Sequence, residues 1–192
     1  MKEYALVPAL ALSLLSPQLF ATEADKQFYI GANLGVGSGE ETISIDGDEE
    51  DYDTDISTMR LAVGFIVDEN IRIEASYGGY DLEFDDFEDS EITTFEFDGY
   101  LLFPADGVTP YVTAGLGLAT YEDTGDVLEG DDLSGVSLQL GAGISMPVSE
   151  VVELDASYRI KVIGWETVEV FDTEIETSHS MGLFTVGGRV LF

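Results

Sequence analysis

Residues 184–192 read Phe-Thr-Val-Gly-Gly-Arg-Val-Leu-Phe, and the pattern of these nine residues predicts the fold class. The even-numbered positions are apolar or small, whereas Thr185, Gly187 and Arg189 fall between them. A period of two is that of a β-strand, whose side chains point alternately to its two faces. One face of the strand is apolar and the other carries an arginine. This difference predicts that the strand separates an apolar environment from a polar one.

Seven earlier segments show the same alternation. They are residues 28–36, 58–67, 71–77, 95–103, 111–118, 136–146 and 152–162. In all eight segments one parity class contains no charged residue, and the other is polar, small or charged apart from Ile66, Leu102 and Leu191 near strand ends. Gly78 and Gly79, directly after the third segment, are interpreted as a bulge that resets its register. The sequence therefore predicts eight β-strands with two chemically distinct faces.

Parity alone fits a soluble barrel with its apolar face inward as well as a membrane barrel with that face outward. Connection lengths favour the membrane barrel, because residues 68–70, 104–109 and 147–150 form short turns and the other connections are long. The polar class is also rich in Gly and Ser, which suits the narrow interior of eight strands. We predict an all-β fold, an eight-stranded antiparallel up-and-down transmembrane β-barrel.

Aromatic residues on the apolar face mark the two expected edges of the bilayer. One group falls at the end with the short turns: Phe28, Phe65, Phe103 and Phe192. The other falls nearer the long connections: Tyr77, Phe95, Tyr158 and Phe184, with Trp165 close by. Two such girdles predict the height of the membrane on the barrel.

The first 21 residues are predicted to be a secretory signal peptide. Lys2 gives a short positive region, residues 4–15 are apolar but too short to span a bilayer, and Ala21 ends a plausible cleavage site. An N-terminal core helix is the alternative, but nothing in the sequence caps or continues it. Residues 22–192 then form the barrel domain, and the absence of cysteine excludes a disulfide framework.

The formal net charge is −32, and its position along the chain is informative. Of the 39 acidic residues, 27 fall in four predicted loops, 40–55, 81–91, 122–135 and 163–178, which hold no Lys or Arg. Nucleic-acid binding is excluded, because phosphates would be repelled. The predicted loops face outward as a solvated acidic surface.

One acidic loop is rich in the hard oxygen ligands that calcium prefers. The candidate metal ligands are Asp46, Asp48, Glu50, Asp51 and Asp53. The spacing does not meet the EF-hand pattern, because no Gly stands at the sixth position from Asp46 or Asp51. Two alternatives are a repelling, solvated surface and loose bridging of divalent cations to lipopolysaccharide phosphates.

Almost every basic residue beyond the signal peptide falls on a predicted inward position, together with several acids. The predicted lumen charge network consists of Arg60, Arg72, Glu74, Glu96, Asp98, Glu153, Asp155, Arg159, Lys161 and Arg189. Unpaired charges in a closed lumen are costly, so we expect them to form ion pairs. The network either fills and stabilises the barrel or lines a path for small ions or solutes.

Three segments resemble recurring segments of small outer-membrane β-barrel proteins: residues 109–119, 155–159 and 186–192. This group is similar to the membrane domain of outer-membrane protein A and to eight-stranded porin-like barrels. The resemblance implies an integral location in the bacterial outer membrane, with membrane lipids and lipopolysaccharide as partners. It also implies that the barrel assembly machinery reads Phe192 as an assembly signal. It favours a structural or surface-interacting protein without a cofactor; a narrow channel for small solutes is the alternative.

The single histidine raises a further alternative, a lipid A-modifying enzyme. His179 lies between Ser178 and Ser180, and both serines point to the opposite face of a strand from the histidine. A catalytic base must reach its nucleophile, so this arrangement does not favour catalysis. We predict a solvated histidine at a strand end, no catalytic residues and no enzymatic activity.

Overall fold

The computed structural model describes residues 27–45, 48–83, 90–122, 133–170 and 173–192. The predicted signal peptide and the candidate ligand Asp46 lie outside the described residues. No helix in the described part of the chain is long and apolar enough to cross a membrane.

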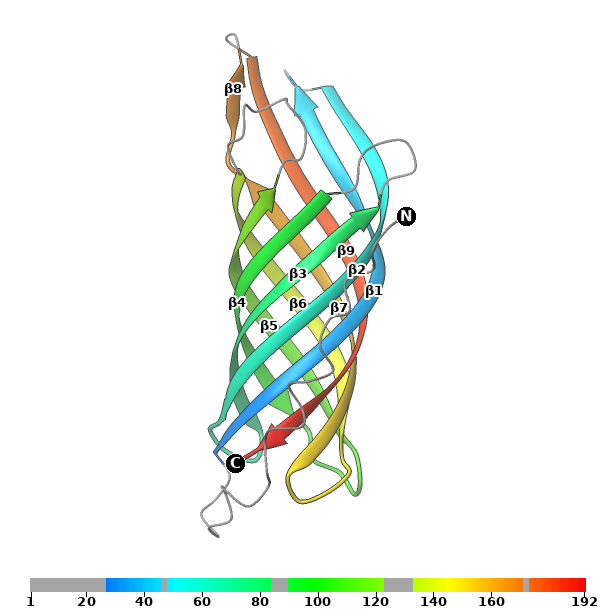
Figure 1. Cartoon of the computed structure of the whole chain (residues 1–192), viewed down its shortest axis with the longest axis vertical. Coiled ribbons are helices and arrows are strands. Elements are labelled where there is room, and N and C mark those ends of the chain that lie inside the picture. Colours follow the sequence, from blue (N-terminus) through cyan, green and yellow to red (C-terminus); the bar gives the residue numbers. More distant parts are fainter. Residues whose placement is uncertain (1–26, 46–47, 84–89, 123–132, 171–172) are drawn as a thin grey trace, which may run out of the picture.

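Eight long antiparallel strands close into a barrel, as predicted (Figure 1). These strands are β1 (Phe28–Ile45), β2 (Asp48–Ile66), β3 (Ile71–Glu83), β4 (Ser90–Leu102), β5 (Thr109–Glu122), β6 (Leu133–Pro147), β7 (Val152–Trp165) and β9 (Thr173–Leu191). A short ninth strand, β8 (Val168–Val170), pairs with β9 beyond the end of β7. Each long strand pairs with the next long strand in the sequence, so the predicted up-and-down topology is confirmed.

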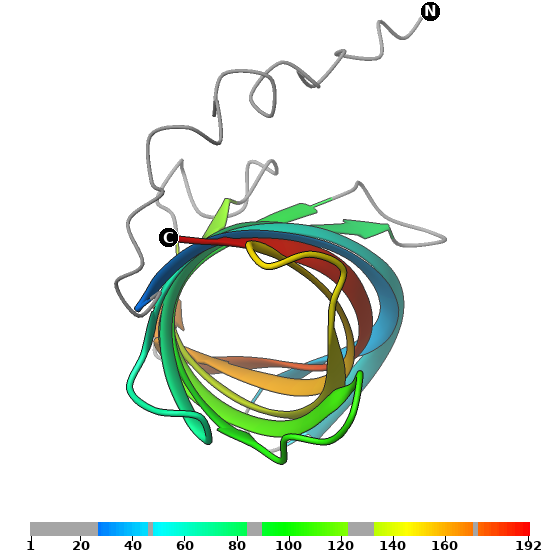
Figure 2. The same ribbon diagram turned by 90° about the horizontal axis from the view of Figure 1, so that it is seen from below.

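The first and last long strands join to close the ring, which is visible end-on in Figure 2. Their register runs from Tyr29 opposite Leu191 to Ile45 opposite Ile175. At the lower end Phe28 and Phe192 exchange backbone hydrogen bonds of 3.2 and 2.9 Å, and their rings stack 6.4 Å apart. Closure removes the free strand edges that would otherwise pair with other chains.

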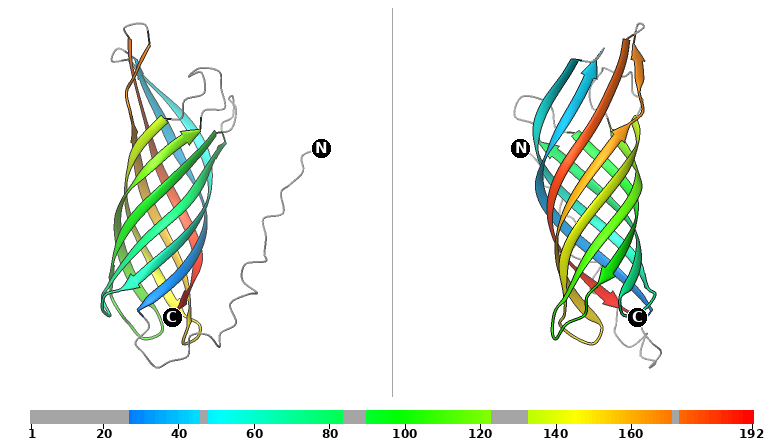
Figure 3. Two further views of the ribbon diagram at one scale, coloured as in Figure 1. Left: turned by 60° about the vertical axis from the view of Figure 1, so that its left-hand side comes forward. Right: turned by 180° about the vertical axis from the view of Figure 1, so that it is seen from behind.

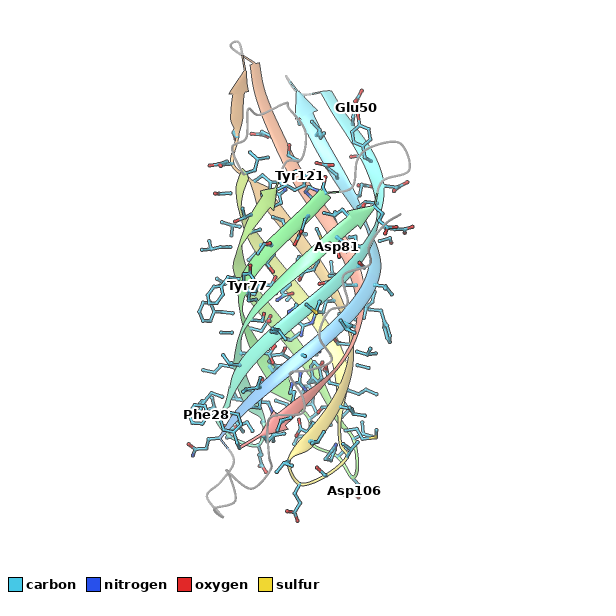
Figure 4. All side chains as sticks on the ribbon, viewed as in Figure 1. Phe28, Glu50, Tyr77, Asp81, Asp106 and Tyr121 are labelled. Carbon is cyan, nitrogen blue, oxygen red and sulfur yellow. The ribbon has the colours of Figure 1, made fainter. Side chains whose placement is uncertain are left out.

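The lower and middle part of the barrel carries an apolar outer face. Large side chains such as Leu140 (66 % exposed), Leu116 and Phe97 are exposed on this face, and so are six of the girdle residues: Phe28, Phe103, Tyr77, Phe95, Tyr158 and Phe184. Figure 4 shows Phe28 near the lower end and Tyr77 higher up, both directed away from the barrel. Residues 136–146 of β6 span this belt, which fits the roughly 9–11 residues that a tilted strand needs to cross a bilayer.

Three short turns connect strands at the end where the chain terminates, as the connection lengths predict. In one of them the Asp68 carboxylate accepts hydrogen bonds of 2.8 Å from the backbone N–H groups of Asn70 and Ile71. Another contains Gly107 at a φ of 79°, a conformation that glycine adopts without strain.

The strands at the other end are longer than predicted. β1 and β2 stay paired from Phe28 opposite Phe65 up to Ile45 opposite Asp48, so most of the predicted 40–55 loop is a β-hairpin. Figure 3 shows this hairpin and the β8–β9 hairpin rising above the rest of the barrel. The prediction was wrong because it followed apolar alternation, which ends where the outer face meets water although the backbone pairing continues.

Polarity reverses in this upper part of the barrel. Asp55, Asp81 and Glu91 point outward, whereas Ile56 and Leu82 are buried inside. The prediction that the inward class is polar throughout is therefore wrong above the belt. A barrel wall with a charged outer face and an apolar interior is surrounded by water, so the reversal marks where the protein leaves the membrane.

The predicted bulge at Gly78 and Gly79 is absent. Met59 pairs with Gly79 and Arg60 with Gly78 in an unbroken register. A Cβ on Gly78 would lie 2.5 Å from Cγ of Arg60, so this glycine makes room for the arginine side chain. The sequence pattern appeared to slip because an inward glycine and the buried Tyr80 follow the outward Tyr77.

Candidate functional site in the barrel lumen

Arg60 lies at the centre of the lumen and contacts three carboxylates. Its Nη2 donates to Glu74 Oε1 at 3.3 Å and to Asp98 Oδ2 at 3.1 Å. Its Nε lies 3.6 Å from Glu96 Oε2. The same Nη2 also donates to Ser76 Oγ at 2.9 Å. The four charged groups come from strands β2, β3 and β4, which register places side by side.

Each of the three carboxylates carries a second cation from the opposite side of the barrel. Arg159 Nη1 lies 3.5 Å from Asp98 Oδ2, and Arg189 Nε lies 3.8 Å from Glu74 Oε2. Lys161 forms a close ion pair with Glu96. Arg189 extends the chain of contacts to Asp155, at 3.3 Å. These eight residues form one continuous set of ion pairs, which we call the central network.

The charges of the lumen balance. The central network holds four basic and four acidic residues, and Arg72 pairs separately with Glu153 through contacts of 2.7 and 3.0 Å. All ten residues expected in the lumen thus lie in ion pairs there. Since these charges cancel, the net charge of −32 is carried by other parts of the chain.

Tyrosines complete the central network, and sequence reasoning missed their part in it. Tyr29 and Tyr100 each donate to Glu74, at 2.9 and 2.8 Å, and Tyr111 donates to Asp155. Lys161 donates to Tyr80 and lies 4.0 Å from the centre of its ring, within cation–π range. Tyr29, Tyr100 and Tyr111 occupy the polar parity class of their strands, and this position was the sequence signal from which their place in the lumen could have been predicted.

Directly above the central network, apolar side chains fill much of the lumen. A cluster of buried side chains fills it, which we call the apolar plug: Ile56, Tyr80, Leu82, Ile92, Ala119, Ile163, Trp165, Met181 and Leu183. Tyr121 and Leu133 pack against this cluster. The Lys161 ammonium group lies directly beneath, fully buried. Trp165 is 9 % exposed and lies inside the barrel, not in the outer aromatic girdle where it was expected.

His179 is buried, contrary to the prediction of a solvated strand end. It is 1 % exposed and faces the lumen, and its Nδ1 accepts a hydrogen bond of 2.7 Å from Nε1 of Trp165. Ser178 and Ser180 lie on the outer face, as predicted. Neither serine can therefore serve as a nucleophile activated directly by this imidazole.

Acidic side chains gather on the outer surface where the apolar belt ends. Glu40, Asp53, Asp55 and Glu83 line a groove of about 570 Å³ that also borders Tyr158. Figure 4 places Glu50 and Asp81 on the same upper part of the molecule. These residues belong to strands, so the pleat sets consecutive acids on opposite faces.

That pleat separates the candidate calcium ligands. Glu50 lies on the inner side of the β1–β2 hairpin, whereas Asp51 and Asp53 lie on its outer side, and the side chain of Asp48 is not described. Within the described residues, no three or more acidic or histidine side chains are grouped so that they could hold a metal ion.

Comparison with known proteins agrees with this architecture. The family model for the outer membrane protein beta-barrel domain matches residues 7–177. The chain therefore belongs to this family, and it is an integral outer-membrane protein. No curated protein matches it in sequence.

Solved structures show the same fold at low sequence identity. The chain is similar to Neisserial surface protein A at 22 % identity, with a TM-score of 0.59 over 86 % of this chain and 97 % of the other. OprG from Pseudomonas aeruginosa gives 12 % identity and a TM-score of 0.54 over 87 % and 96 %. Outer membrane protein AlkL gives 12 % and 0.56 over 90 % and 93 %.

Proposed function

We propose that this protein is a non-conducting outer-membrane barrel that serves a structural role and presents an acidic surface to the outside of the cell. The observation that carries the proposal is the charge-balanced central network lying beneath the apolar plug. Ions crossing the lumen would have to break ion pairs in one layer and enter an apolar layer in the next.

A narrow channel for small ions or solutes is the alternative. Eight strands leave an interior that side chains can fill, and the buried residues of both layers occupy it here. A conducting path would need free charged groups along its wall. In the central network each carboxylate already faces one or more cations, which argues against such a path.

Planar-bilayer recording of the refolded chain tests the proposal. We expect no unitary current steps from protein that shows the heat-dependent gel shift of a folded barrel, while a porin added to the same bilayer conducts. Reproducible steps from the folded chain would contradict a closed lumen. An Arg159→Met variant would then show whether the central network sets the ion selectivity.

We propose that the outer acidic groove interacts with lipopolysaccharide. Tyr158 of the upper aromatic girdle borders the groove, and such aromatic residues lie at the level of the lipid head groups, where phosphates are found. Phosphates and carboxylates repel each other, so divalent cations are needed between them. We propose loose bridging of this kind, with Phe192 acting earlier as the signal read by the assembly machinery.

Calorimetry can measure the bridging. Calcium titrated into the folded protein with lipopolysaccharide is expected to give binding heat that falls when Asp53→Asn and Asp55→Asn are combined. The matched control combines Glu69→Gln and Asp106→Asn, which remove two acids from the short-turn end. Equal heats from both double variants would contradict a role for the groove.

A catalytic role in lipid A modification is not part of the proposal. The only histidine is buried, donates nothing to Ser178 or Ser180, and accepts its hydrogen bond from an indole. Lipid A from cells that express His179→Ala is therefore expected to match lipid A from cells that express the unchanged protein.

A further inference from the structure

The hydrogen bond between Trp165 and His179 fixes the protonation state of the imidazole. An indole N–H can only donate, so Nδ1 of His179 must carry a lone pair. The neutral ring then holds its single proton on Nε2. This Nε2–H has no hydrogen-bond partner, and the closest ion-pair contact it makes is with Glu41 Oε1, at 3.7 Å.

A second proton can bind the imidazole only at Nδ1, and this atom already accepts the hydrogen bond from Trp165. The proton would meet the Trp165 N–H there, at a donor–donor separation of 2.7 Å. Protonation therefore breaks the bond to Trp165. The imidazolium that forms is attracted to the Glu41 carboxylate on the neighbouring strand β1.

We propose that His179, Trp165 and Glu41 form a proton-sensitive switch that couples external acidity to the packing of Trp165 at the base of the β8–β9 hairpin. In the neutral state Trp165 is bonded to His179 and packed against Tyr121 at a ring distance of 5.6 Å. In the protonated state His179 pairs with Glu41, and Trp165 is released. The inference is independent of whether the lumen conducts.

The position of Trp165 at the base of the β8–β9 hairpin explains what the switch would change. It is the last residue of β7, and the chain continues from it into the β8–β9 hairpin that rises above the barrel. Trp165 is also part of the apolar plug, so its side chain ties the base of the hairpin to the interior. Figure 4 shows Tyr121, its packing partner, at this height.

Among the residues that the structure describes, few other titratable groups face His179. Glu41 and the pair Glu50 and Tyr52 come from β1 and β2, and Tyr121 comes from β5. Below the histidine, Lys161 of β7 is held by Glu96 and Tyr80. Glu41 is therefore the carboxylate placed to receive the imidazolium, since Glu50 is bonded to Tyr52.

Burial opposes the charged forms of both partners. It lowers the pKa of His179 from 6.5 to about 4 and raises the pKa of Glu41. Because the unfolded chain binds a proton at His179 before the folded chain does, folding stability falls as the pH drops from about 6.5 towards 4. A Glu41 carboxylate that is still ionised stabilises the imidazolium as a contact pair, and this attraction must offset both burial costs for the switched arrangement to form.

The chain contains one tryptophan, so its fluorescence reports on Trp165 alone. With the folded protein in detergent, we expect the emission spectrum and the accessibility to acrylamide to change as the pH falls through about 4, the pKa of His179 in the folded state. His179→Gln should abolish this transition, because its amide oxygen accepts the same hydrogen bond but does not titrate. Glu41→Gln should move the midpoint to lower pH, because the imidazolium loses its counter-charge.

Two controls separate the switch from unfolding. The gel shift and far-ultraviolet circular dichroism must stay unchanged through the transition, and His179→Phe should show the released emission at every pH. A wild-type spectrum that does not depend on pH would overturn the proposal. So would a transition that persists in His179→Gln, since another group would then be responsible.

Discussion

Replacing Arg60 by alanine is expected to lower the free energy of unfolding by about 3–5 kcal/mol, the usual cost of leaving buried charges without their partner. Arg60 contacts Glu74, Glu96 and Asp98, and all three side chains are almost completely buried. Its loss leaves one uncompensated negative charge among three adjacent carboxylates. The measurement is the urea concentration or temperature at which the folded band disappears on an unheated gel.

Two companion variants test the reason for this loss. Arg60→Lys keeps the charge but loses the planar fork that reaches several carboxylates, so it should fall between wild type and alanine. Removing both partners of the separate pair, Arg72→Met with Glu153→Met, should change stability little, because no charge is left alone. An Arg60→Ala barrel that unfolds at the same urea concentration as wild type would show that the central network does not stabilise the fold.

Leu140→Arg is expected to destabilise the folded barrel in lipid by about 2–4 kcal/mol, the cost of an arginine on the lipid face near the bilayer midplane. Leu140 is 66 % exposed and stands at the middle of the apolar run on β6. We expect a lower yield of folded protein in lipid vesicles and a lower midpoint of urea unfolding.

Ser134→Arg is the matched control for this variant. Ser134 lies on the same strand and the same face, but beyond the belt, so an arginine there should cost only about 0–1 kcal/mol. Equal folding yields for the two variants would mean that the apolar outer face does not lie where the membrane is.

Much of the barrel could be predicted because one rule acts along the whole membrane-spanning part. Lipid surrounds the outer face, so each strand must keep charge off every second position, and Leu116, Leu140 and Ile160 all obey this. The basic residues then have only one side on which to lie. Arg60, Arg159 and Arg189 could be assigned to the lumen for this reason before any contact was known.

This rule applies only where lipid surrounds the barrel, and the predictions made from the sequence fail beyond the membrane edge. In water the outer face accepts charge, so Asp53 and Asp55 look like loop residues although they continue β2. The same change hides the apolar plug, because Ile163 and Met181 occupy the parity class that was expected to be polar. His179 was misplaced for the same reason.

Alternation and charge exclusion are local properties of each strand, so the eight-stranded membrane barrel, its short-turn end and the inward charges could be predicted from the amino-acid sequence. Which of these charges form ion pairs depends on how the strands are arranged in three dimensions. Arg189 reaches Asp155 and Glu74, and Trp165 reaches His179, across strands whose relative stagger is set by closure of the ring. Contacts inside the lumen depend on that stagger, and no single strand encodes it.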